Sequence, residues 1–150
     1  MGTLFAIENA LTHPTVKGLV LLNTPLKVCI RWAAVKNSLG RRKQGIESTS
    51  PCFEDKCGVM LTRNPFLYAL WIPNYLALFR ETRAVRRILS KLNTPALAFH
   101  SRRDELVSAK SVLYLSEAAS VEISELADSS HFLYSDNAAT LIRRETLNIL

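Results

Sequence analysis

Asp104 and His131 are titratable residues that each follow the end of an apolar run. Asp104 lies four residues beyond the run ALAFH (96–100), and His131 lies five residues beyond SVEISEL (120–126). If both runs are neighbouring strands of a parallel sheet, their carboxyl ends meet at one edge, and the loops that follow can bring a carboxylate to an imidazole. An aspartate that holds one ring nitrogen fixes the tautomer of a histidine and leaves the other nitrogen free to take a proton from a nucleophile. The two residues are therefore a candidate acid–base pair.

Other titratable residues have simpler explanations. We expect His100 to be a strand-end residue and His13 to be a favourable charge at the carboxyl end of a helix. Asp128 and Asp136 are weaker acid candidates, because turn and capping roles explain them. Simpler explanations also stay open for the pair itself: Asp104 could be a turn-forming residue, and His131 could be a loop histidine without a partner.

Three apolar runs predict the strands of one sheet. Residues 17–23 (KGLVLLN) form a continuous run that ends at Thr24-Pro25, as in a strand buried on both faces of a parallel sheet. Residues 96–100 form a second short strand. Residues 120–126 alternate apolar with polar side chains, as in a half-exposed edge strand.

Helical spacing surrounds these strands. Residues 2–12 predict a helix that closes before His13-Pro14, and residues 108–119 predict another with Ser108 as its N-cap. Asp136 is expected to cap a final helix with Leu141, Ile142, Ile149 and Leu150 on its apolar face. Between the first two strands, residues 30–39 read as a helix, and residues 64–92 read as two helices separated near Pro73 or Arg80. The order predicts an α/β fold with about three parallel strands, flanking helices and a helical insertion at about 26–92.

Composition and charge exclude several classes of protein. The 150 residues, 48% of them hydrophobic, suffice for one globular domain, 1–150. No apolar run approaches the roughly 20 residues of a membrane-spanning helix, and no secretory signal is recognisable, so with Met1 as a true start the expected location is the cytoplasm. The net charge of +6 is concentrated in residues 31–43 and 80–91, which lack the interleaved aromatics of a nucleic-acid surface and are expected to be solvated helix faces.

The cysteines do not predict a metal site or a disulfide framework. Cys29, Cys52 and Cys57 are odd in number and lie within one stretch of the chain. A zinc site needs a second close pair of ligands, which the sequence lacks. We expect free thiols, no metal and no cofactor.

At three places the sequence resembles the α/β-hydrolases. TPALAFHSRRDELVS is similar to the turn that carries their catalytic acid, and ADSSHFLYSD is similar to their histidine turn. Met1-Gly2-Thr3 resembles the second half of their nucleophile elbow, G-x-S-x-G. Ser101 and Ser130 stand where many members have glycine.

The resemblance implies a partial α/β-hydrolase domain that starts just after the nucleophile. In complete form the protein would be a serine hydrolase of the carboxylic ester or lipid class, with an ester, acylglycerol or peptide as substrate. Asp104 and His131 would be catalytic, the serine would lie one residue before Met1, and the backbone amide of Met1 would be an oxyanion-hole donor. The 150-residue chain would then be inactive.

The resemblance also assigns a role to the helical insertion. Residues 26–92 would be the lid that such enzymes insert before the acid strand. Phe66, Trp71 and Tyr75 are candidates for an apolar wall over the substrate, with ordinary helix packing as the alternative.

Two other functions remain open: a non-catalytic α/β-hydrolase-like remnant that binds a partner, and a small basic binding module unrelated to the family. Because a neighbouring strand would precede Met1, the GLVLL strand would expose an unpaired edge through which the chain could self-associate.

Overall fold

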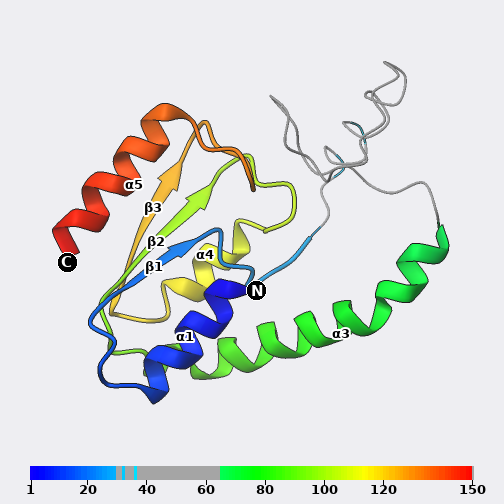
Figure 1. Cartoon of the computed structure of the whole chain (residues 1–150), viewed down its shortest axis with the longest axis horizontal. Coiled ribbons are helices and arrows are strands. Elements are labelled where there is room, and N and C mark those ends of the chain that lie inside the picture. Colours follow the sequence, from blue (N-terminus) through cyan, green and yellow to red (C-terminus); the bar gives the residue numbers. More distant parts are fainter. Residues whose placement is uncertain (30–31, 33–35, 37–64, 150) are drawn as a thin grey trace.

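The computed structural model describes residues 1–29, 32, 36 and 65–149 (Figure 1). The predicted helix at 30–39, the basic stretch at 31–43, and Cys52 and Cys57 lie wholly or mostly outside the described residues.

A parallel three-stranded sheet forms the centre of the fold, as predicted. Its order is β1 (Leu19–Leu22), β2 (Ala96–Ser101), β3 (Val121–Leu126), and its register aligns Leu21 with Ala98 and Ala98 with Ile123. Every residue of β2 is buried, because β2 is the central strand and helices cover both of its faces. Residues of β3 are mostly half-buried or exposed, which agrees with the predicted edge strand.

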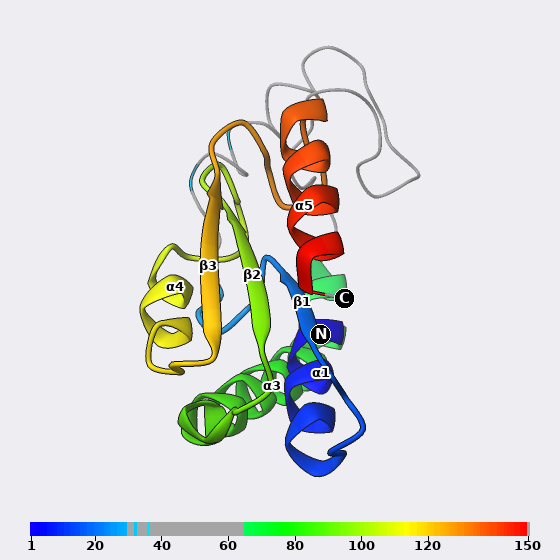
Figure 2. The same ribbon diagram turned by 90° about the vertical axis from the view of Figure 1, so that its left-hand side faces the viewer.

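Helices cover the two faces of the sheet. On one face lie α1 (Gly2–Thr12), which packs against β1, α3 (Pro65–Ile88), and α4 (Lys110–Leu115), which packs against β3; on the other face lies α5 (Asp136–Ile149). Figure 2 shows α4 and α5 on opposite sides of the strands. The alternation along β2 explains the two layers: Ala96 and Ala98 belong to the first core, and Leu97 and Phe99 to the second. The partial α/β architecture predicted from the sequence is confirmed.

The segment 65–88 differs from its prediction. It is one continuous helix, α3, with Pro73 in its interior, and a short 3-10 turn (Leu89–Lys91) follows it. The expected break near Pro73 or Arg80 is therefore wrong. Pro73 has no backbone N–H and so removes one hydrogen bond of the helix, but the helix continues on both sides of it. The amino-terminal half of α3 extends beyond the sheet (Figure 1), whereas Val85 at its other end is fully buried in the core.

Three other details also differ. We expected β1 to be buried on both faces, but Leu22, its last residue, is 36% exposed. The helix predicted at 108–119 is shorter; it begins at Lys110, and Ser108 Oγ accepts the N–H of Lys110 at 3.3 Å. At the start of α5, Ser135 Oγ accepts the N–H of Ala138 at 3.2 Å, so Ser135 rather than Asp136 supplies the capping oxygen.

The second basic run, residues 80–91, lies mainly on α3. Arg83 and Arg87 are exposed, as a solvated face requires. Arg86 is half-buried instead: its Nε donates to the carbonyl of Leu26, and its guanidinium lies 4.4 Å from the centre of the Tyr114 ring. Among the described residues, no helix is both long and apolar enough to cross a membrane.

Candidate active site

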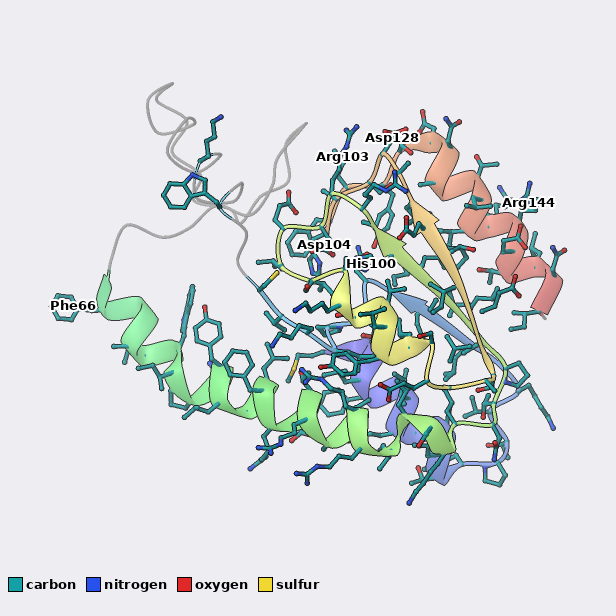
Figure 3. The ribbon with its side chains drawn as sticks, turned by 180° about the vertical axis from the view of Figure 1, so that it is seen from behind. Phe66, His100, Arg103, Asp104, Asp128 and Arg144 are labelled. Carbon is teal, nitrogen blue, oxygen red and sulfur yellow. The ribbon has the colours of Figure 1, made fainter. Side chains whose placement is uncertain are left out.

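Asp104 is held in a tight turn after β2. Its Oδ1 accepts the backbone N–H groups of Leu106 at 2.8 Å and Val107 at 2.7 Å, the geometry of an aspartate that closes its own turn. The side chain is 1% exposed. Figure 3 shows Asp104 in the loop beyond the end of β2.

A second segment fixes this turn from outside. Val28 forms an isolated antiparallel bridge with Val107, Cys29 N–H donates to the carbonyl of Leu106 at 2.7 Å, and Ser108 N–H donates to the carbonyl of Lys27 at 2.8 Å. The chain that leaves β1 therefore supports the turn that carries the carboxylate.

His131 meets the second oxygen of Asp104. Its Nδ1 lies 2.7 Å from Asp104 Oδ2, and its side chain is 21% exposed. The ring of Phe132 packs edge-on against the imidazole, with 4.6 Å between ring centres. A neutral histidine in this position carries its proton on Nδ1, where the carboxylate accepts it, and presents an unprotonated Nε2. Strands β2 and β3 are neighbours, and that is why two loops well separated in sequence meet here.

His131 borders an open cavity of about 350 Å³, and Asp104 lies buried behind it. The cavity also contains the start of α1, where the first backbone N–H groups of a helix have no partner within the helix. Most other walls are aliphatic. The lining residues are Met1, Gly2, Thr3, Leu22, Asn23, Pro25, Val28, Leu78, Leu106, Val107 and His131.

The pKa of the Tyr134 hydroxyl depends on its burial and on the charge of Asp104. Burial raises the pKa of its hydroxyl above the ordinary value, the negative charge of Asp104 raises it further, and a hydrogen bond from Asn23 lowers it. The tyrosine is therefore neutral at physiological pH.

The structure thus brings Asp104 and His131 together, and it places Met1 on the same cavity. Phe66, Trp71 and Tyr75 are not among the residues that line it. Trp71 and Tyr75 pack against each other on α3, with 6.4 Å between ring centres, and Phe66 lies near the far end of that helix (Figure 3). The α3 residue on the cavity is Leu78.

The weaker candidates lie elsewhere. Asp128 forms an exposed ion pair with Arg103 at 3.1 Å, and Asp136 is the first residue of α5. His100 is buried on β2, and His13 follows the end of α1 with its Nδ1 2.8 Å from Thr12 Oγ1. Among the described residues, no group of three or more histidine, cysteine or acidic side chains could hold a metal ion.

The sequence predictions missed Asn23, Glu105 and Tyr134. Glu105 is 6% exposed, and its Oε2 lies 3.4 Å from the backbone N of His131. Asn23 directly follows β1, so its place at a strand end was the one signal that could have pointed to it.

The architecture of the described residues is a partial α/β-hydrolase fold. No known protein-family profile and no curated protein matches the sequence. Solved structures do match it, across nearly its whole length. A solved chain described under the metagenome-derived lipolytic enzymes LipS and LipT gives a TM-score of 0.63 at 17% identity, over 99% of this chain and 61% of the solved chain.

The monoacylglycerol lipase of Paleococcus ferrophilus gives a TM-score of 0.59 at 17% identity, over 98% of this chain and 64% of the lipase. Est1E from Butyrivibrio proteoclasticus, solved with ferulic acid bound, gives 0.52 at 15% identity, over 96% of this chain and 54% of Est1E. The chain therefore spans less than two thirds of the length of each of these structures, and it has their fold.

Proposed function

We propose that Asp104 and His131 are the acid and the base of a Ser-His-Asp triad in an enzyme that hydrolyses carboxylic esters. The observation that supports this most directly is the 2.7 Å contact between Asp104 Oδ2 and His131 Nδ1 beside a cavity. The fold that this chain shares with lipolytic enzymes makes ester hydrolysis the first reaction to test.

In this proposal Asp104 keeps the proton of His131 on Nδ1 and stabilises the imidazolium that forms during the reaction. His131 Nε2 takes the proton of a serine hydroxyl as the serine oxygen attacks the ester carbonyl. The same nitrogen then returns the proton to the departing alcohol, which leaves an acyl-serine. In the second half of the reaction, His131 Nε2 takes a proton from water as the water oxygen attacks the acyl carbonyl. The proton then goes to the serine oxygen as the carboxylic acid leaves. The backbone amide of Met1, at the start of α1, would donate to the oxyanion.

The nucleophile in this proposal is a serine directly before Met1. Of the described residues that line the cavity, only Thr3 carries a hydroxyl, and the proposal gives it no catalytic role. The aliphatic walls formed by Leu22, Val28, Leu78 and Leu106 favour an apolar acyl group over a charged peptide, so the substrate class we propose is an ester or acylglycerol.

The test uses an extended protein in which a Gly-x-Ser segment and the sequence upstream of it precede Met1. Asp104→Asn and His131→Ala should each lower kcat for a short p-nitrophenyl ester by about 10³- to 10⁴-fold, because members of a triad act as a unit. Asp128→Asn is the matched control, because it neutralises an exposed carboxylate of the neighbouring turn. If either site variant keeps the parent rate, the assignment of these residues is wrong.

A further inference from the structure

Asn23 connects three segments that surround the acid–base pair. Its side-chain Oδ1 accepts the backbone N–H of Ser101 at 2.7 Å, at the end of β2. Its Nδ2 lies 3.3 Å from the carbonyl oxygens of both Ser130 and His131, and 3.0 Å from Tyr134 Oη. The residue is 3% exposed.

The Ser101 contact fixes which way the amide points. Because a backbone N–H can only donate, the atom that faces it is the oxygen, and the Nδ2 group is turned toward the loop at 127–135, which we call the histidine loop. An NH₂ group has two hydrogens, and here it faces two carbonyl oxygens and two hydroxyls, those of Ser101 and Tyr134. An aspartate of the same shape would place a second oxygen against these carbonyls and repel them.

The backbone at this position also restricts the residue type. Asn23 has φ 45°, in the left-handed region that glycine, asparagine and aspartate adopt most readily. Of these three residues, only asparagine combines the acceptor that Ser101 needs with the donor that the histidine loop needs.

The main chain of His131 is held on both of its polar groups. Its carbonyl faces Asn23 Nδ2, and its N–H faces Glu105 Oε2 at 3.4 Å. Asp104 then meets the ring at Nδ1.

We propose that Asn23 is a positioning residue that fastens the histidine loop to the ends of β1 and β2, so that the His131 ring stays within hydrogen-bonding distance of Asp104. This inference rests on the proposed function for its catalytic meaning, because the position of the ring matters for catalysis only if the pair transfers protons.

Tyr134 provides an independent reporter of the same geometry. Burial and then the negative charge of Asp104 raise the pKa of its hydroxyl, and the hydrogen bond from Asn23 lowers it. Loss of the Asn23 amide should therefore move the Tyr134 titration to higher pH, and Asp104→Asn should move it to lower pH. A general loosening of the fold would move the Tyr134 titration in the same direction in both variants.

The experiment compares Asn23→Asp and Asn23→Gly in the 150-residue chain. Asn23→Asp keeps the shape and the oxygen that faces Ser101, removes the donor and adds a negative charge beside Tyr134. Asn23→Gly keeps the left-handed backbone and removes the side chain without adding charge, so it is the variant that isolates loss of the donor. Long-range proton–nitrogen NMR correlations report which ring nitrogen of His131 carries the proton. The ultraviolet titration of each protein minus that of the same protein with Tyr134→Phe reports the ionisation of Tyr134 among the four tyrosines. Circular dichroism confirms that each variant is folded.

We expect the parent chain to show His131 protonated on Nδ1, and both variants to lose that single tautomer and to titrate Tyr134 at higher pH. Tyr134→Phe removes one acceptor and leaves both carbonyl contacts, so it should keep the tautomer. An unchanged tautomer in both Asn23 variants would overturn the inference; Asn23→Gly alone decides it if Asn23→Asp does not fold.

The extended protein separates this inference from the proposed function. There, Asn23→Gly should lower kcat by about 10- to 100-fold with little change in KM, since a small misplacement of a catalytic group has this order of effect. If Asp104→Asn leaves hydrolysis unchanged while the Asn23 variants alter the tautomer, the proposed function fails and the positioning role stands.

Discussion

Replacement of Asp104 should separate the structural role of its carboxylate from its role toward His131. The side chain is 1% exposed and makes three short contacts, to Leu106 N, Val107 N and His131 Nδ1, all between 2.7 and 2.8 Å. Asparagine keeps an oxygen for both backbone N–H groups and changes only the contact with the histidine. Alanine removes both acceptor oxygens, and with them all three contacts, and leaves the two buried backbone N–H groups without their acceptor.

The difference between the two variants can be worked from these contacts. Loss of one hydrogen bond to the carboxylate, with a neutral amide left in its place, should cost about 1–2 kcal/mol for Asp104→Asn. Asp104→Ala breaks a buried pair and also strands two N–H donors, which should cost about 3–5 kcal/mol. A loss of that size is a large part of the stability of an ordinary domain, which is about 5–15 kcal/mol.

Urea unfolding followed by circular dichroism measures both changes. The slopes of the unfolding free energy against urea should agree between variants, so that shifts of the midpoint report stability. Asp128→Ala is the control, because that carboxylate belongs to an exposed ion pair and its removal should cost less than about 1 kcal/mol. Equal losses for the asparagine and alanine variants would refute the account of the turn.

Four further predictions concern other parts of the chain. In the 150-residue chain, turnover of a p-nitrophenyl ester should not depend on His131, since the proposed serine lies outside the chain; a rate that His131→Ala abolishes would contradict this. Arg86→Lys should lower stability by about 1 kcal/mol in thermal unfolding, because lysine replaces neither the guanidinium over Tyr114 nor its geometry toward the Leu26 carbonyl. Because the folded-state pKa of Tyr134 is raised, its stabilising contribution is present below about pH 10 and is lost as pH rises through the folded pKa, so Tyr134→Phe should flatten the alkaline decline of the unfolding free energy. As β1 is an edge strand of the described sheet, size-exclusion chromatography should show self-association; a monodisperse monomer would mean that the edge is protected.

The strands and the proximity of Asp104 to His131 could be predicted because their signals are local. A buried parallel strand needs a continuous apolar run, and the residues that follow such runs must gather at one edge of the sheet. Because Asp104 and His131 follow two such runs, the sequence predicts that they lie in adjacent loops. The continuity of α3 could not be predicted in the same way. Pro73 is a local signal for a break, but the packing of Val85 and Leu89 into the core stabilises the carboxyl-terminal part of the segment whatever happens at the proline.

Asn23 could not be predicted as a site residue in the same way. It directly follows β1, so the rule that directs attention to residues beyond strand ends applies to it as well as to Asp104 and His131. Because an asparagine amide does not titrate, Asn23 carries no sequence signal for acid–base chemistry. Its partners, Ser101 and Tyr134, lie 78 and 111 positions further along the chain, so no local pattern could reveal that its amide is satisfied on both sides. Orientation of a catalytic base depends on such neutral donors and acceptors as much as on charge. Asparagine, serine and tyrosine that follow strand ends are therefore candidates for the residues that position a pair such as Asp104 and His131.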